Sequence, residues 1–195
     1  ELGWGGYWFW DPVENASLMP WLSATALIHC VVVLQRRNTM QSWTMVLAIL
    51  TFSLSLAGTF LVRSGVLNSV HTFASDPGRG LFILIFLFII LSSSFLLFAL
   101  KSEKINKPSL HNISSRNTGI MVNNWLLISI LSVVFLGTMY PLATDLIYSQ
   151  SLTVGPQYYA ISITPIIILF LFFMILSPQL SLSLIHISEP TRQSK

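Results

Sequence analysis

The stretch Trp4-Gly-Gly-Tyr-Trp-Phe-Trp-Asp-Pro-Val-Glu-Asn15, which runs into the uncharged segment Ala16–Leu34, contains the signals that decide the fold. Asp11 is a favoured N-cap residue, Pro12 suits the first position of a helix, and Glu14 gives a capping-box spacing. The uncharged segment has roughly the 20 residues that a helix needs to cross a bilayer. The sequence therefore predicts an aromatic segment at a membrane surface that leads into a membrane helix.

Composition assigns the chain to the integral membrane proteins. Hydrophobic residues make up 53% of its 195 residues. Charged residues make up only 9%, against about 25% in a soluble domain. The net charge of +3 does not indicate nucleic-acid binding, because the basic residues lie in short loops between apolar runs. Cys30 is the only cysteine, so neither a Cys-x-x-Cys dithiol nor a cysteine zinc cluster is expected.

Five uncharged stretches are long enough to span a membrane, and they predict an all-α, polytopic bundle over residues 16–178. These stretches are Ala16–Leu34, Trp43–Val62, Leu81–Leu100, Trp125–Leu142 and Tyr159–Leu176. Pro20 is expected to kink the first helix or to separate an interfacial turn from its spanning part. Ser177-Pro178 is expected to close the fifth helix.

Positive charge is concentrated on one side of the predicted bundle. Arg63 and Arg79 fall on the opposite side from six basic residues, which are Arg36, Arg37, Lys101, Lys104, Lys107 and Arg116. The positive-inside rule places the loop 101–118 in the cytoplasm or the mitochondrial matrix, and residues 1–15 and the loop 63–80 outside. In a bacterial inner membrane, residues 1–15 would then lie in the periplasm, and a mitochondrial inner membrane is the alternative.

The aromatic segment (residues 4–11) has two interpretations. Tryptophan and tyrosine gather in membrane-interface belts, which is the commoner reason for such a cluster. A membrane-interface belt needs neither the Gly5-Gly6 pair nor Asp11. A ligand-binding surface uses glycines together with indoles, because glycines let the backbone approach a flat ligand and indoles offer rigid faces with a polar N–H. The order of the residues favours a shelf for a planar, mostly apolar, partly anionic ligand such as haem. For Asp11 itself, a helix cap is an equally good explanation.

Two histidines are candidates for iron ligation. His29 lies inside the first predicted span, where an ionisable residue is a functional-site hypothesis by default. The alternative is a neutral imidazole that is hydrogen-bonded to a neighbouring helix, although neutral imidazole is also a common axial ligand of haem iron. His71 lies in the outer loop, on the same side as the aromatic segment, but alone it is typical of an ordinary loop histidine. His111 is expected to be solvated in the basic loop.

The order of these motifs resembles the tryptophan-rich WWD family of haem-handling membrane proteins. The similarity is to its CcmF branch in particular, the large membrane subunit of cytochrome c haem lyase, with a paralogue that serves nitrite-reductase cytochromes as the alternative. It covers about residues 1–178 and rests on motifs that follow one another in order. They are residues 4–17, Met19-Pro-Trp-Leu22, Thr25–His29, Trp43-Thr44, Gly58–Leu67, Ser69-Val-His71, Asp76–Gly80, Gly137–Leu142 and Val154-Gly-Pro156.

The resemblance implies two haem sites. His71 matches an external axial ligand to haem that a haem chaperone delivers. The signature that cradles this delivered haem matches Trp4, Tyr7, Trp8, Trp10 and Asp11, with Tyr7 where the family often has another tryptophan. His29 matches an intramembrane ligand of a separate haem b.

The implied activity is covalent attachment of haem vinyl groups to the two thiols of a Cys-x-x-Cys-His motif in apocytochrome c. Positioning contributes more to this chemistry than acid–base catalysis, and no acid or base is assigned. The implied partners are the haem chaperone, apocytochrome c and the subunits that present it, with quinol as an electron source. Each family haem has a second histidine ligand that neither His111 nor His186 matches. The chain, which begins with Glu1, is therefore expected to be a fragment that is inactive alone.

Two other functions stay open. A haem exporter or handler would load a chaperone without making a covalent bond, and its gene would lack the long multi-helix extension after His71. A secondary transporter would bind no haem, and its aromatic segment would be a membrane belt.

The end of the chain departs from the family pattern. Residues 182–192, within the tail 181–195, neither continue that pattern nor resemble an ordinary loop, and they can be back-translated into a transposon-type sequencing adapter. We therefore predict that this tail is not native and assign it no function.

Overall fold

Five helices make up most of the residues that the computed structural model describes, which are 7–37, 39–66, 76–101, 116–149 and 152–187. The helices are α1 (Pro12–Arg37), α2 (Gln41–Ser64), α3 (Pro77–Lys101), α4 (Arg116–Tyr148) and α5 (Pro156–Ile187). Each contains a stretch that is long and apolar enough to cross a membrane. The prediction of an all-α, polytopic membrane fold is confirmed.

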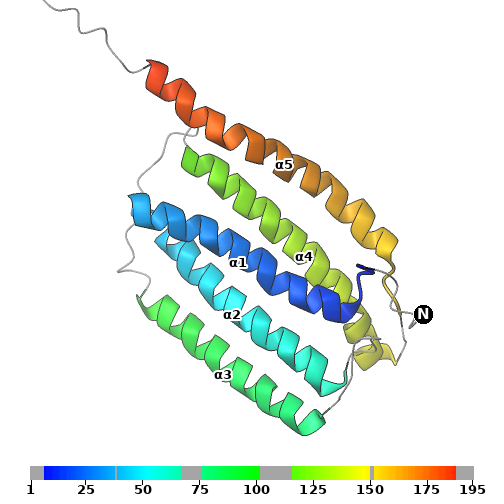
Figure 1. Ribbon diagram of the computed structural model, residues 1–195. Helices are drawn as coiled ribbons and strands as arrows, with labels where there is room; N and C mark the ends of the chain where they lie inside the picture. Colours follow the sequence, from blue (N-terminus) through cyan, green and yellow to red (C-terminus); the bar gives the residue numbers. More distant parts are fainter. Residues whose placement is uncertain (1–6, 38, 67–75, 102–115, 150–151, 188–195) are drawn as a thin grey trace, which may run out of the picture.

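The helices lie side by side in the order α3, α2, α1, α4, α5, which differs from their order in the sequence (Figure 1). The chain returns from α3 to place α4 against α1, so α1 contacts both α2 and α4. Neighbouring helices run in opposite directions (Figure 1). The start of α1, the end of α4 and the start of α5 therefore meet at one end of the bundle, which we call the aromatic end.

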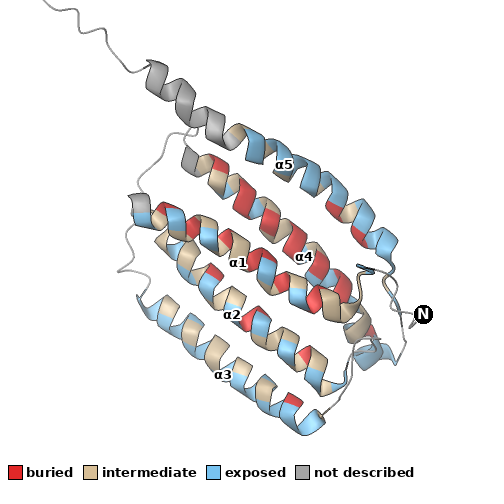
Figure 2. Ribbon diagram, viewed as in Figure 1, coloured by how far each residue is buried: buried red, intermediate tan, exposed pale blue. Residues whose placement is uncertain are grey.

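The core lies between α1 and α4. Figure 2 shows the buried positions concentrated on these two helices, while α3 is mostly exposed or half-buried. On α1 the buried apolar residues recur every three or four positions, which keeps them on one face of a helix. They are Ala16, Met19, Leu22, Ala26, Cys30 and Val33. The α4 residues Leu127, Leu131 and Val134 belong to the same cluster. Because α1 is central, both of its ends are held by neighbouring helices.

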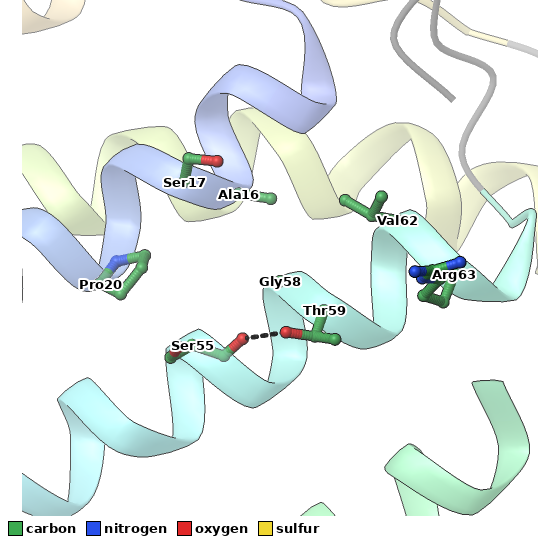
Figure 3. Close-up of a pocket in the computed structure, with 8 residues that line it drawn as sticks. All are labelled: Ala16, Ser17, Pro20, Ser55, Gly58, Thr59, Val62 and Arg63. Atoms are coloured by element: carbon green, nitrogen blue, oxygen red, sulfur yellow. Dashed lines mark hydrogen bonds between the residues drawn. The ribbon is translucent and has the colours of Figure 1, made fainter. Parts of the chain in front are cut away.

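α1 runs through Pro20 without a break, so the proline does not divide the helix into two elements. A proline has no N–H for the carbonyl of the residue four positions earlier, here Ala16. In this structure Gly58 of α2 lies against that carbonyl, and a Cβ on Gly58 would be 3.1 Å from the Ala16 oxygen. The absence of a side chain at Gly58 therefore lets α2 approach this carbonyl closely, as happens where weak Cα–H···O contacts form between packed helices. The helix therefore continues through Pro20 (Figure 3).

The other helices extend beyond the uncharged runs. α4 begins before Asn123 and Asn124, which the sequence analysis placed outside the span, and both are buried. α5 continues through Pro178 to Ile187, so Ser177-Pro178 does not close the helix as expected. Neighbouring groups in a membrane helix can satisfy the carbonyl that a proline leaves free. Most of the predicted loops 63–80 and 101–118, and residues 188–195 of the tail, lie outside the described residues.

Candidate functional site

The aromatic segment lies at the aromatic end of the bundle, and several of its aromatic rings are exposed. Tyr7 is fully exposed, and Phe9 and Trp8 are 53% and 40% exposed. Trp8 meets Trp10 edge to face, with ring centroids 5.9 Å apart. The structure therefore brings together two of the predicted haem-cradling tryptophans, while Trp4 lies outside the described residues.

A complete capping box joins the aromatic segment to α1. The Asp11 carboxylate accepts a hydrogen bond from the Val13 N–H at 3.0 Å, and the Asp11 carbonyl accepts one from the Asn15 N–H at 2.9 Å. The Glu14 carboxylate accepts from the backbone N–H groups of Asp11 and Phe9, at 3.1 and 2.9 Å. The predicted N-cap is confirmed, and Glu14 also fixes the chain two residues before the cap.

Asn15 anchors the segment to two distant helices. Its side chain is fully buried, and Nδ2 lies 3.1 Å from each of three acceptors, namely the Trp10 carbonyl, Thr138 Oγ1 and Tyr159 Oη. Its Oδ1 has no hydrogen-bond partner among the described residues. We call Asn15, Trp10, Thr138 and Tyr159 the Asn15 cluster. The sequence analysis did not single out Tyr159 or the side chain of Asn15.

Trp10 has an unusual backbone that the Asn15 cluster holds in place. Its φ is 60°, in the left-handed region that costs a bulky residue free energy. Its indole stacks on the Tyr159 ring with centroids 4.5 Å apart and planes 3° from parallel. Gly137 of α4 makes room for this stack, because a Cβ there would lie 2.8 Å from Tyr159 Cε1 and Oη. One face of Trp10 is therefore occupied by the protein itself.

A small cavity lies beneath the aromatic segment. It has a volume of about 200 Å³, and its lining includes Trp10, Thr138, Val66 and Asp145. Pockets that enclose small ligands usually have roughly 300–1,000 Å³. The cavity is therefore too small to enclose a haem-sized ligand. Val66 is the last described residue before the segment that contains His71, which itself lies outside the described residues.

A second cavity at the same end separates α1 from α2. It has a volume of about 440 Å³, and Figure 3 shows Ser17 and Pro20 on one wall and Thr59 and Arg63 on the other. Arg63 is exposed and is the basic residue at the end of α2. The cavity is open, so it is a groove on the bundle surface.

His29 lies on α1, 18 residues after Asp11. At 1.5 Å per residue, the helix separates the two residues by about 27 Å. The half-buried imidazole places Nδ1 3.1 Å from Oδ1 of Asn124 on α4. Asn124 is 1% exposed, and its Nδ2 also donates to Cys30 Sγ at 3.0 Å. The structure therefore keeps His29 apart from the aromatic segment and shows the hydrogen bond to a neighbouring helix that the sequence analysis gave as the alternative. The partner, Asn124, was not singled out there.

The donor set around His29 is compatible with haem iron. An imidazole that donates its Nδ1 proton keeps a lone pair on Nε2, which is the usual arrangement of a ligating histidine. Within the described residues, no three histidine, cysteine, aspartate or glutamate side chains gather as a metal cluster would require.

These features define a polytopic α-helical membrane protein with an anchored, exposed aromatic segment at one end and a hydrogen-bonded histidine within a span. Residues 1–67 match the family described as cytochrome C assembly protein. The cytochrome c-type biogenesis protein CcmF of Pseudomonas aeruginosa is 53% identical over 166 residues, 85% of this chain and 25% of that protein. CycK of Bradyrhizobium diazoefficiens is 49% identical over 181 residues, 93% of this chain and 27% of that protein.

A solved structure described as cytochrome c heme lyase CcmF aligns with 100% of this chain and 26% of its own, with a TM-score of 0.68 and 28% identity. The chain belongs to the CcmF family of cytochrome c-type biogenesis proteins. NrfE of Haemophilus influenzae is more distant, at 41% identity over 177 residues, 90% of this chain and 28% of that protein. The chain spans about a quarter of the length of the curated relatives that it matches.

Proposed function

We propose that this chain forms the haem-binding part of a cytochrome c haem lyase, which holds haem as a substrate at the aromatic segment. Two thiols of apocytochrome c then add to the two haem vinyl groups. In each addition the S–H bond and the vinyl π bond are replaced by one C–S and one C–H bond, without net oxidation. The protein contributes by holding the substrate in place while its vinyl edge stays open to the thiols.

The observation that carries this proposal is the anchored aromatic segment. The Asn15 cluster and the capping box fix the backbone around Trp10, while the rings of Tyr7, Trp8 and Phe9 stay exposed. A membrane belt has no need of such anchoring, whereas a rigid aromatic surface binds a planar ligand at a lower cost in conformational entropy. Asp11 acts mainly as the helix cap.

His71 would be the axial ligand to this substrate haem. It lies five positions after Val66, which lines the same cavity as Trp10. Five extended residues span at most about 18 Å. The chain length therefore allows the His71 side chain to reach the aromatic segment.

His29 would hold a separate, resident haem b inside the membrane. Such a haem transfers single electrons, and here it would keep the iron of the substrate haem reduced, with quinol as the electron source. The polar contact at Nδ1 supports this assignment, because an imidazole that donates its Nδ1 proton to Asn124 has a lone pair on Nε2 for iron.

The aromatic end would face the periplasm of a bacterial inner membrane. The basic residues favour this orientation, because most of them lie toward the opposite end of the helices. The haem chaperone and apocytochrome c, with the subunits that present it, would then meet the aromatic segment in that compartment.

Absorption spectra of the protein, expressed from its native gene with its partner subunits and purified in detergent, test the proposal. We expect His29→Ala to lose the haem b signal, and Trp8→Ala and His71→Ala to lose only haem delivered by the chaperone. Trp21→Ala is the matched control, because Trp21 is also exposed but lies on the body of α1.

Unchanged spectra in the first three variants, or a wild-type protein without haem, would contradict the proposal and favour a transporter with an aromatic belt. A protein that loads the chaperone but forms no thioether bond on apocytochrome c would be a haem handler instead.

A further inference from the structure

We propose that Asn124 is a positioning residue for His29, selecting the imidazole tautomer that can bind iron and setting how strongly it donates electrons. The inference rests on the proposed role of His29 as a haem ligand. It concerns a residue on a different helix, to which the sequence analysis assigns no role.

The side-chain amide of Asn124 is held between two consecutive residues of α1. Its Oδ1 lies 3.1 Å from His29 Nδ1, and its Nδ2 donates to Cys30 Sγ at 3.0 Å. Asn124 and Cys30 are almost completely buried, at 1% and 0% exposure. Both ends of the amide are therefore occupied, and the side chain has little freedom to rotate.

The orientation of this amide decides which imidazole nitrogen carries the proton. With Oδ1 toward His29, the imidazole donates from Nδ1 and leaves the lone pair on Nε2. A reversed amide would donate its own N–H to Nδ1 and place the proton on Nε2, which could not then bind iron. The structure has the first orientation, in which Asn124 Nδ2 donates to Cys30 Sγ at 3.0 Å and is not left buried without a partner.

The surroundings strengthen the effect of this contact. Cys30 belongs to the apolar core that α1 and α4 share, where a hydrogen bond is electrostatically stronger than in water. An acceptor at Nδ1 makes the imidazole a more basic ligand. A more basic axial ligand stabilises ferric relative to ferrous iron, so the contact with Asn124 lowers the midpoint potential of the haem.

The test is a spectroelectrochemical titration of the haem b in the protein expressed from its native gene, together with its haem content. Asn124→Leu removes the acceptor and keeps a side chain of similar size in an apolar core. We expect it to raise the midpoint, by about 59 mV for each tenfold change in the ratio of ferric to ferrous affinity. Loss of such an outer partner also weakens metal binding by roughly 10- to 100-fold.

Two further variants separate positioning from general damage. Asn124→Asp keeps an acceptor toward His29, so we expect it to retain haem and to shift the midpoint in the opposite direction, downward. Asn123→Leu is the matched control, because Asn123 is also buried on α4 but has no hydrogen bond to His29 in this structure. We expect its haem content and midpoint to equal those of the wild type.

A wild-type midpoint and haem content in Asn124→Leu would overturn the inference. If that variant fails to accumulate, an unchanged or raised midpoint in Asn124→Asp overturns it instead. Failure of the proposed function looks different, because the wild type would then show no haem b signal, or His29→Ala would leave that signal intact.

Discussion

Replacing Asn15 by leucine should release the aromatic segment while the bundle stays folded. The Nδ2 group joins the Trp10 carbonyl to Thr138 on α4 and Tyr159 on α5. Leucine has a similar volume and no donor, so the change removes this link without opening a large cavity. The Trp10–Tyr159 stack and the capping box remain in the variant and oppose release of the aromatic segment.

The size of the effect follows from the hydrogen bond to Trp10. A buried hydrogen bond contributes about 1 kcal/mol net. Because Oδ1 of Asn15 has no partner among the described residues, the substitution removes only the hydrogen bonds that Nδ2 donates. Trp10 meanwhile keeps its left-handed backbone, which costs about 1–3 kcal/mol and opposes docking. A change of about 1 kcal/mol raises the population of the released segment about fivefold.

Hydrogen exchange measured by mass spectrometry reports this population. The amides of Phe9 and Asp11 are protected by Glu14, so they should exchange about fivefold faster in Asn15→Leu when opening is limited by the local equilibrium. Ser17→Ala is the control, because its exposed hydroxyl donates only to the Val13 carbonyl of the same helix. Exchange in Asn15→Leu that matches the wild type would refute the reasoning, as would an equal increase along the whole of α4.

Three further substitutions test other contacts at the same end of the bundle. Gly137→Ala should move Tyr159 from beneath Trp10 and lower the free energy of unfolding by about 1–3 kcal/mol, as measured by thermal unfolding. Gly155→Ala should be neutral, because no atom lies within 4 Å of its new Cβ. Equal effects of the two substitutions would contradict the close contact at Gly137. Asp11→Asn should keep both the helix cap and haem binding, whereas Asp11→Ala should lower the free energy of unfolding by about 1 kcal/mol. Loss of haem from a stably folded Asp11→Asn variant would show that the carboxylate acts on haem directly. Gly65→Ala should cost about 1 kcal/mol, because Gly65 ends α2 in the left-handed region, and an unchanged melting temperature would count against this.

Local signals in the sequence were enough to predict the elements. Charge-free runs identified all five spans, and Asp11, Pro12 and Glu14 marked the start of α1 correctly. These features depend on neighbours within a few residues along the chain. The order of the helices in space depends on which faces pack together, and no local pattern contains that information.

The missed parts of the site share one physical cause. Asn124 reduces the hydropathy of its surroundings and therefore looks like the boundary of a span. It is instead buried, because its polar atoms find partners on α1, a helix 95 residues away in the sequence. Asn15 and Tyr159 likewise pair across 144 residues. Pairing over such distances cannot be read from one sequence, since each side chain alone is also compatible with a solvated surface.

The position of α1 between α2 and α4 also affects when its contacts can form during synthesis of the chain. Asn15 leaves the ribosome 144 residues before Tyr159, which at about 5–20 residues per second is an interval of roughly 7 to 30 s. During this interval Asn15, close to the start of α1, can bind water at the membrane surface, while His29 awaits a partner from a helix not yet made. The aromatic segment is thus made before the two helices that anchor it, and it acquires its fixed conformation only after α5 has been inserted.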